Sequence, residues 1–540
     1  MQCLQLLTDA LSQGTIAASN PDLRAKQMIG DHPLPSPVSR LPPELLAKIF
    51  EHLVTCSSPA TLLRVCHRWA GISTSISSLW TRIDFSTPPT PFLKHSTDRP
   101  IEVNLLSSPA VPKSDQLWAA RRVISLQKDR VWKLVLDLPV DHLRKMGPDL
   151  SAIFPILVEV SISTLHNDHR NLRLLEFPTW VPAANPLSPI RYLKLLLVKT
   201  PWVPGRFQNL VEFFLHDQWY ADLDPPMDIF LGILEASPLL AVLSVANAGP
   251  RLPLDTSVLP PATRIVHLRK LQQLYLEQED PCDVGWVLIH LKIPISANVR
   301  IFVDIRPDNQ TPVPLELVFN LILPNHPGFP HLTDVQRCTY AVSARPACVI
   351  TAPNFTLNVV WDHLLHDDHF ECFMLPFLRR VTADGPIENL SVVTNLHRRH
   401  SLGGLDWKPI FDTLGSLRKL RVEQSRRNSD FSILGLLQSQ LCPTLRDLEL
   451  SFVVFGRAGT EEREGEAVSG EFVDYFAERD RRGCRLERLV IEAPRNAPPD
   501  LASSLAPHVD YVEIREGVAG DEDVWVEFGS RLVFDSLQAC

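Results

Sequence analysis

The stretch from Leu41 to Phe85 decides the fold of the N-terminal part of this chain. It begins LPPELLAKIFEHLV at residue 41 and closes with LLRVCHRWAGISTSISSLWTRIDF at residues 62–85. Apolar residues recur in its first part at the spacing of one helix face, namely Leu45, Leu46, Ile49, Phe50 and Leu53. Pro42 and Pro43 lie at the start, where first-turn N–H groups lack a helical acceptor, and Glu44 faces the positive helix end. The pattern predicts an amphipathic helix.

A second helix is predicted directly after it. Ser58 is its expected cap and Pro59 lies in its first turn. Its apolar face consists of Leu62, Val65, Cys66 and Trp69. A unit of this size, below about 40 to 60 residues, rarely buries enough surface to be stable alone. We therefore expect part of the apolar surface to meet another protein.

The order LPxELL, then VCxRW, then LW resembles the F-box, which is carried here by Leu41 to Leu53, Leu62 to Trp69, and Leu79 with Trp80. The resemblance implies a three-helix unit that docks on a Skp-type adaptor, and through it on a cullin and a RING subunit of a ubiquitin ligase. It implies adaptor contacts from Leu41, Pro42, Glu44, Leu45, Leu46, Ile49, Leu62 and Val65. It implies a domain core of Phe50, Leu53, Cys66, Trp69, Leu79 and Trp80. The alternative is an ordinary helical hairpin inside a larger core.

Composition limits what the whole chain can be. With 540 residues, 45% hydrophobic and 21% charged, it is long enough for two or more globular units. The net charge of −9 leaves no basic field to attract nucleic acid or an anionic membrane. The ten cysteines form no CxxC pair, which favours reduced thiols and a cytoplasmic or nuclear location. No apolar run approaches the roughly 18 residues of a membrane span, so we expect a soluble protein.

Outside the F-box-like stretch the chain divides into several parts. Residues 1–40 read as an N-terminal helix and a proline-rich linker, residues 41–86 as the F-box-like domain, and residues 100–540 as a repeat region. The repeat is apolar, two variable, apolar, one variable, apolar. Its eleven copies begin at Leu157, Ile190, Leu210, Leu240, Leu271, Leu288, Leu378, Leu417, Leu445, Leu486 and Val509.

This repeat resembles the irregular leucine-rich repeats that are often joined to an F-box, although the family's polar Asn or Cys after the strand is mostly absent. The resemblance implies short parallel strands lining a solenoid, with helices such as 227–236, 430–441 and 471–482 on its convex side. Residues 294–377 break the pattern as an irregular insert in which 299–305 and 355–360 alternate like strands. Residues 456–470 read as an acidic, solvated loop. We expect an α+β chain: a small three-helix F-box followed by an irregular α/β solenoid. An unrelated α/β domain is the alternative.

Signatures of catalysis are missing. No phosphate-binding P-loop, dinucleotide-binding glycine motif, HExxH zinc motif or GxSxG elbow occurs, so we expect a non-catalytic protein without a cofactor. The densest set of ligand-type residues is His363, His366, Asp367, Asp368, His369 and Cys372. On a helix, three of these share a face that suits a metal, but a polar exposed helix face is the preferred interpretation, and no metal site is predicted.

Polar residues between or directly after the repeat leucines are expected on the concave surface. Acidic ones outnumber basic ones there, which suggests a basic target segment. The predicted target-binding residues are Tyr275, Arg421, Glu423, Glu449 and Glu492. We expect the chain to be the target-recognition subunit of a Skp–cullin–F-box ubiquitin ligase, whose target is an unidentified protein. The alternatives are an interaction scaffold outside any ligase, and an enzyme with a site built from distant residues.

Overall fold

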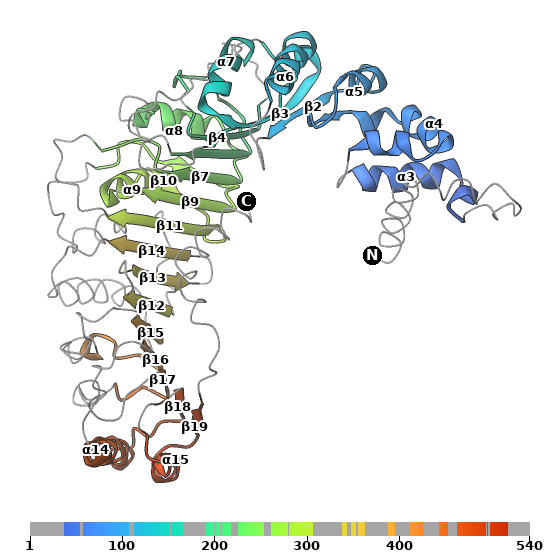
Figure 1. Ribbon diagram of the computed structural model, residues 1–540. Helices are drawn as coiled ribbons and strands as arrows, with labels where there is room; N and C mark the ends of the chain where they lie inside the picture. The colour runs from blue at the N-terminus through green and yellow to red at the C-terminus, as the bar shows by residue number, and fades with distance from the viewer. Residues whose placement is uncertain are drawn as a thin grey trace, which may run out of the picture. The chain divides into compact units, whose positions relative to one another are not determined.

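A computed structural model describes most of the chain between Pro37 and Glu516 (Figure 1). The described residues are 37–54, 58–106, 113–150, 153–165, 190–198, 200–205, 207–217, 225–252, 261–278, 280–305, 337–342, 347–352, 355–361, 387–394, 411–424, 442–451, 462–492, 494 and 497–516. They fall in two compact units that divide between residues 214 and 224. Both helices and strands are present, as an α+β chain requires.

The first unit opens with short helices. They are η1 (Pro37–Arg40), α3 (Pro43–Val54), η2 (Pro59–Arg64), α4 (His67–Ser75) and η3 (Ser77–Trp80), followed by β1 (Arg82–Ile83) and α5 (Thr90–His95). The first predicted helix is α3. The second forms as two pieces, η2 and α4, because Cys66 between them is extended, with φ −163° and ψ 166°. Ser58 does cap η2: its Oγ accepts a hydrogen bond from the N–H of Ala60 at 3.4 Å.

Aromatic rings form the core of these helices. The rings of Phe50 and Trp69 lie 4.9 Å apart, and Trp80 is fully buried with its indole N–H donating to the carbonyl of Ser73 at 2.8 Å. Trp80 also packs against Phe92 of α5, at 5.5 Å between centroids. Strand β1 pairs in parallel with β2 (Ile101–Leu106). The helices are therefore joined to the following sheet by packing and by backbone hydrogen bonds.

The rest of the first unit alternates strands and helices. After β2 come α6 (Ser114–Gln127), η4 (Lys128–Arg130), β3 (Val131–Pro139), α7 (Val140–Leu150), β4 (Glu159–Leu165) and β5 (Tyr192–Leu196), and β6 (Glu212–His216) reaches the division between the units. Strands β2 to β5 pair in parallel in chain order, with the apolar residues of the repeat in register, as in Val160 opposite Leu193. Alternate side chains point to opposite faces, so these residues share one buried layer.

The second unit repeats this construction. It contains α8 (Met227–Glu235), β7 (Val242–Ala246), β8 (Val266–His267), β9 (Gln273–Gln278), α9 (Pro281–Leu288), β10 (Leu291–Lys292), β11 (Asn298–Ile305), β12 (Arg337–Val342), β13 (Ala347–Ala352), β14 (Phe355–Trp361), β15 (Asn389–Thr394), β16 (Lys419–Gln424), β17 (Asp447–Ser451), α14 (Glu462–Arg481), β18 (Arg488–Glu492), α15 (Leu501–Leu505) and β19 (Val512–Arg515). Strands β7, β9, β11 and β14 are parallel neighbours, as are β12 and β15 to β19.

The predicted insert contains an inserted set of strands. Strand β13 pairs antiparallel with both β12 and β14, and β14 rather than β12 lies beside β11. The chain thus runs through β12, β13 and β14 in the reverse of their spatial order. The strands expected at 299–305 and 355–360 correspond to β11 and β14.

Most predicted repeat copies form strands, namely β4 to β7, β9 and β16 to β19. The copy at Leu288 instead gives β10, which pairs only with β8 in a separate two-stranded sheet. The copy at Leu378 lies outside the described residues. The strand pattern is therefore present, while its assignment as a leucine-rich repeat stays a prediction.

One expected loop is wrong in part. Helix α14 begins at Glu462, so residues 462–470 of the predicted acidic loop are helical. Glutamate and arginine are good helix formers, and their number here outweighs the glycines. The predicted N-terminal helix, the cluster from His363 to Cys372 and the helix at 430–441 lie outside the described residues. No helix in the described part of the chain is long and apolar enough to cross a membrane.

Candidate adaptor and target surfaces

Helix α3 separates its leucines onto two faces. Leu46 and Phe50 are buried, at 1% and 0% exposed, whereas the neighbouring Leu45 is 47% exposed. Val65, directly after η2, is 40% exposed. These two exposed aliphatic side chains belong to the predicted adaptor set, and the exposed Pro42 and Glu44 belong to it as well.

Two predicted adaptor contacts and one predicted core residue need correction. Leu46 and Leu62 are buried inside the first unit, at 1% and 3% exposed, because each lies on the inward face of its helix. Cys66 was expected in the core but is exposed. Its thiol accepts a hydrogen bond from the N–H of Trp69 at 3.5 Å and so caps α4. Apolar periodicity could not distinguish a capping role of Cys66 from a core role, because a small side chain beside an apolar face suits both.

Four of the other predicted core residues are buried, while the predicted adaptor contacts stay a prediction. Phe50, Trp69, Leu79 and Trp80 are buried core residues, and Leu53 is half-buried. Leu41 and Ile49 are half-buried at the margin of the exposed face. The guanidinium of Arg68 in α4 donates to the carbonyl of Leu41 at 2.5 Å, which ties the segment before α3 to the rest of the domain.

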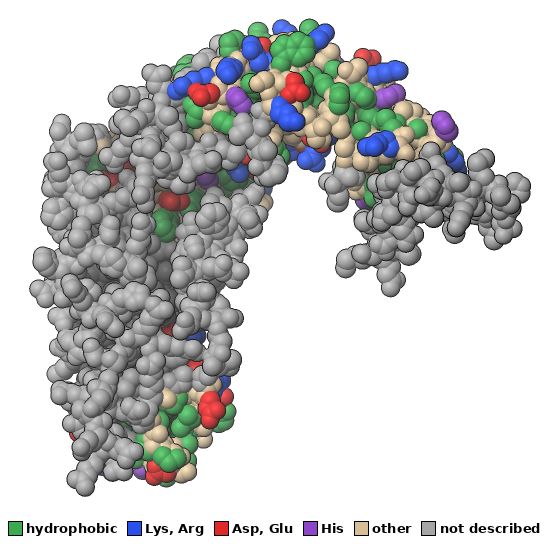
Figure 2. Space-filling model, viewed as in Figure 1, with side chains coloured by type: hydrophobic (Ala, Val, Ile, Leu, Met, Phe, Trp, Pro, Cys, Tyr) green, Lys and Arg blue, Asp and Glu red, His purple; other side chains and the backbone are tan. Residues whose placement is uncertain are grey.

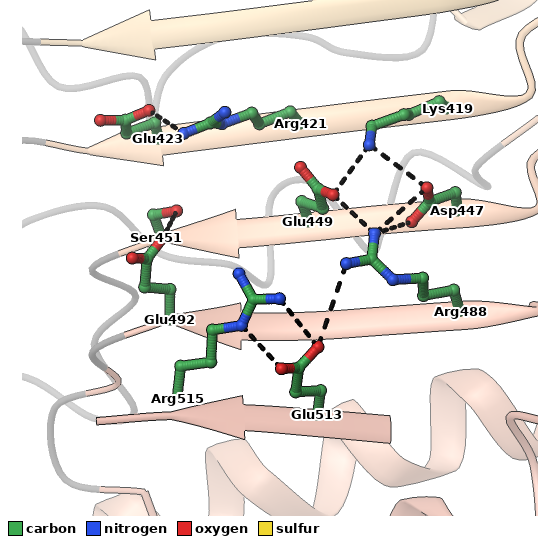
Figure 3. A network of polar contacts seen from close by, with 10 residues as sticks. All are labelled: Lys419, Arg421, Glu423, Asp447, Glu449, Ser451, Arg488, Glu492, Glu513 and Arg515. Carbon is green, nitrogen blue, oxygen red and sulfur yellow. Dashed lines mark hydrogen bonds and ion pairs between the residues drawn. The ribbon is translucent and has the colours of Figure 1, made fainter. Parts of the chain in front are cut away.

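Charged side chains gather on one face of β16 to β19 (Figure 3). We call this set the charge ladder; it consists of Lys419, Arg421, Glu423, Asp447, Glu449, Ser451, Arg488, Glu492, Glu513 and Arg515. The residues that alternate with them, such as Leu420, Leu448 and Leu489, are buried on the opposite face. Parallel register places the charges of successive strands side by side.

Glu449 is at the centre of the charge ladder. Its carboxylate accepts hydrogen bonds from Lys419 Nζ at 2.8 Å and from Arg488 Nη1 at 2.6 Å. Both cations also reach Asp447, at 3.3 Å and 3.2 Å. Burial alone would raise the pKa of Glu449, but these hydrogen bonds outweigh it and hold the pKa below its ordinary value.

The outer members are paired too. Arg515 Nε donates to Glu513 at 2.8 Å, and Arg421 Nη2 donates to Glu423 at 2.8 Å. Glu423 is only 7% exposed, and its burial raises its pKa in spite of the arginine. Glu492 accepts from the hydroxyl of Ser451 at 3.1 Å.

The acidic excess predicted for the concave surface is small on these strands, and binding of a basic target there stays a prediction. Lys419, Asp447 and Arg488 lie on the same face and were not counted with the other polar positions. With them the charge ladder holds five acidic and four basic side chains, most of them in direct contact. A nearly neutral, internally paired surface exerts little long-range attraction on a basic segment.

Tyr275 belongs to a different cluster. It lies on β9, where its hydroxyl donates to Glu277 at 2.5 Å, and burial raises the pKa of the phenol. On the neighbouring β7, the hydroxyl of Ser244 forms a 2.8 Å hydrogen bond with the ring of His216, whose centroid lies 6.3 Å from that of Tyr275. Four of the five predicted target-binding residues are thus together in the charge ladder, and Tyr275 is apart from them.

No group of three His, Cys, Asp or Glu side chains in the described ranges is arranged to hold a metal ion. A search of curated proteins finds no match to the chain. Residues 38–86 match the family model described as F-box-like, and they span α3, η2, α4, η3 and β1. This chain therefore carries an F-box-like domain at residues 38–86.

Proposed function

We propose that this chain is a target-recognition subunit of a Skp–cullin–F-box ubiquitin ligase. The F-box-like domain binds the Skp-type adaptor, and the strand-rich region that follows binds a protein target. The observation that supports this best is the exposure of Leu45 and Val65 in a domain whose other large apolar side chains are mostly buried. Such exposed aliphatic groups gain free energy when a partner covers them.

The size of that gain suits a specific contact. Full burial of an aliphatic side chain contributes roughly 1.5–3 kcal/mol, so Leu45 and Val65 are central anchors rather than the whole interface. The exposed Pro42 and Glu44 lie at the start of the same helix. A polar rim around apolar anchors is the usual arrangement of a protein interface.

In this proposal the chain contributes position rather than chemistry. When a target is held on the second unit, its lysines lie near a ubiquitin-conjugating enzyme that carries ubiquitin. This proximity raises the effective concentration of the target lysines. The charge ladder offers the target a surface of fixed, alternating charges. Such a surface favours binding of a partner whose charges are complementary to this arrangement and disfavours one that places like charges opposite each other.

The test is capture of the full-length chain by an immobilised Skp-type adaptor. The double variant Leu45→Ala/Val65→Ala should lose at least about tenfold in adaptor affinity. The matched control is Leu239→Ala/Ile265→Ala, which truncates two aliphatic side chains of similar exposure, 54% and 43%, in the second unit. Circular dichroism checks that both variants are folded. Equal capture of the two variants would contradict adaptor binding through this face.

Ligase assembly needs a further measurement. Cullin should co-purify with the adaptor and the intact chain, and it should be lost together with the adaptor in the Leu45→Ala/Val65→Ala variant. Adaptor without cullin would identify an interaction scaffold outside a ligase.

A further inference from the structure

The F-box-like domain joins the following sheet through a very short strand. Strand β1 has only two residues, Arg82 and Ile83, and it pairs with β2. Directly after it, Gln116 of α6 adds one hydrogen bond, from Nε2 to the carbonyl of Phe85 at 3.1 Å. Contacts this few, all on one short segment, let the domain rotate about that segment unless another contact opposes the rotation.

Helix α5 supplies another contact. Its Phe92 is buried, with the ring centroid 5.5 Å from that of Trp80 in the domain, and the ring of His95 lies 4.9 Å from the same tryptophan. Figure 2 shows the side chains of the described residues packed without a break from the region of α6 to that of α5, at the top and right of the view. We call α5 and the turn after it, residues 90–99, the strut. A strut opposes rotation only if its far end is fixed.

Arg130 fixes that far end. Its Nη2 donates to the hydroxyl of Ser96 at 2.8 Å and to the carbonyl of Arg99 at 2.9 Å, and its Nε donates to the same carbonyl at 3.1 Å. The other terminal nitrogen, Nη1, donates to Gln127 Oε1 at 2.9 Å. Arg130 is the last residue of η4 and directly precedes β3, the strand that pairs with both β2 and β4. One side chain thus ties the strut to the sheet.

The turn that Arg130 holds has an unfavourable backbone. Thr97 has a φ of 51°, in the left-handed region that a β-branched residue rarely adopts. Its hydroxyl donates to the carbonyl of Ser96 at 2.7 Å, and Ser96 itself is fully buried. A strained conformation of this kind persists only where the surrounding structure holds it. The hydrogen bonds from Arg130 to Ser96 and Arg99, on either side of Thr97, are such a restraint.

We propose that Arg130 is a positioning residue, which locks the strut and so holds the F-box-like domain at one orientation relative to strands β2 to β4. The consequence for ubiquitin transfer rests on the proposed function. An adaptor bound to a domain of fixed orientation brings the ubiquitin-conjugating enzyme to one place, so that only lysines within its reach are modified. Loss of the lock leaves the adaptor surface intact and changes which lysines receive ubiquitin.

Distance measurements between two spin labels on the full-length protein test the lock directly. A keto amino acid carries each label in place of Lys48 in α3 and Arg191 before β5, both exposed, so that the native cysteines stay unlabelled. We expect a single narrow distance distribution in the doubly labelled protein and a distribution about twofold wider, or more, after Arg130→Met. Arg121→Met is the matched control. It removes another half-buried arginine, whose bond to Asp149 joins α6 to α7 without contacting the strut, and it should leave the width unchanged.

Two milder variants separate the hydrogen bonds from the charge. Arg130→Lys keeps the charge, but a single ammonium lacks the fork that reaches Ser96, Arg99 and Gln127 together, so the distribution should stay wide. Ser96→Ala removes one acceptor and should widen the distribution less than Arg130→Met does. It decides the question if Arg130→Met fails to fold. An unchanged width in Ser96→Ala and Arg130→Met, a narrow distribution in Arg130→Lys, or equal widening in Arg121→Met would overturn the proposal.

Self-ubiquitylation shows whether the lock matters for transfer. In a ligase reconstituted with a Skp-type adaptor, a cullin and a RING subunit, mass spectrometry identifies the modified lysines of the first unit. Their number should rise about twofold in Arg130→Met, while adaptor capture stays the same. A wider distance distribution with the same set of modified lysines would contradict the role in transfer. Failure of the intact chain to capture the adaptor would contradict the proposed function alone, because the spin-label distances are measured without adaptor and still decide the role of Arg130.

Discussion

The F-box-like domain and the second unit differ in what they bury. In the described part of the domain the buried side chains are apolar or aromatic, with Ser73 as the polar exception. The second unit buries the charged residues Asp283, Glu423 and Arg479, each at most 8% exposed. A buried charge costs free energy unless hydrogen bonds satisfy it, whereas apolar packing has no such condition.

The buried charges of the second unit have such partners. The carboxylate of Asp283 in α9 accepts from the N–H of Leu252 at 2.7 Å, and Arg479 in α14 donates to the carbonyls of Cys442 and Leu445 at 3.3 Å. These bonds fix one segment against another, and the bond of Asp283 depends on the protonation of its carboxyl group. We therefore expect the second unit to respond to pH and salt and the F-box-like domain to respond mainly to changes of volume in its core.

The largest effect is expected for Trp80→Ala. Removal of a fully buried tryptophan that also donates to Ser73 should cost about 4 kcal/mol. Hydrogen exchange measures the effect locally: amides of α3 and α4 should lose protection, while those of β16 to β18 should keep theirs. Trp118→Ala is the control, since it removes an exposed tryptophan from the same unit. Equal loss of protection in both units would show that the domain is not separately stabilised.

Asp283→Asn should sharpen the contrast in pH response. Burial raises the pKa of Asp283 from 3.8 to about 7, despite the hydrogen bond from Leu252. The folded state thus favours the protonated acid, and its stabilising contribution is full below pH 4 and lost as pH rises to about 7. At pH 8 the variant should be about 4 kcal/mol more stable in the second unit, with no difference at pH 4, because each pKa unit corresponds to about 1.4 kcal/mol.

Urea unfolding followed by hydrogen exchange at pH 4, 6 and 8 measures this difference. The exposed Asp500→Asn variant should keep the pH dependence of the intact protein. If Asp283→Asn retains the pH dependence of stability seen in the intact protein, that dependence arises from another titratable group.

Arg488→Met tests the charge ladder. Its loss leaves Lys419 as the one cation in contact with Glu449 and Asp447 among the described residues, and should cost about 1–2 kcal/mol because the site is only partly exposed. The cost should shrink between 0.05 M and 1 M salt, which screens exposed charges. Arg446→Met removes a more exposed pair, with Glu487 at 3.7 Å, and should cost less than about 0.5 kcal/mol. Equal costs for the two arginines would mean that the ladder acts as separate surface pairs.

Leu45→Ala should have the smallest effect on stability. Truncation of this exposed side chain should change the unfolding free energy by less than about 0.5 kcal/mol, while adaptor affinity falls. Leu46→Ala, one residue further along α3, should instead cost about 3 kcal/mol because Leu46 is buried. Thermal melts and adaptor capture of the two variants distinguish a binding leucine from a core leucine. Similar melting temperatures for Leu45→Ala and Leu46→Ala would contradict the division of α3 into a buried and an exposed face.

The sequence predicted the elements of the F-box-like domain better than the role of each residue. Periodicity locates α3, but Leu45 and Leu46 are adjacent members of one stripe, and only the packing of α3 against α4, η2 and η3 decides which is covered. The break at Cys66 was missed because a thiol that caps a helix and a thiol in a core fit the same pattern. Caps depend on one backbone conformation, which periodicity does not record.

The charge ladder was predicted in part. Arg421, Glu423, Glu449 and Glu492 were found from their place between or after the repeat leucines, and their acidic excess suggested a basic target. Lys419 precedes Arg421 by two residues, so strand alternation places both side chains on the same face. The prediction included Arg421 but not Lys419. The same reason applies to Asp447 and Arg488. Charge balance on a sheet requires every position of the exposed face.

The reversed order of β12, β13 and β14 has a consequence for how the second unit acquires its structure. In a simple stack each new strand can be added to the one just formed, so order propagates along the chain. Here β11 pairs with β9 on one side and with β14 on the other, and β15 pairs with β16 and with β12, so each of the two strands has one neighbour that is distant in sequence. We expect propagation to pause at β11 until the antiparallel β12–β13–β14 meander has closed, because this meander connects strands β7 to β11 with strands β15 to β19.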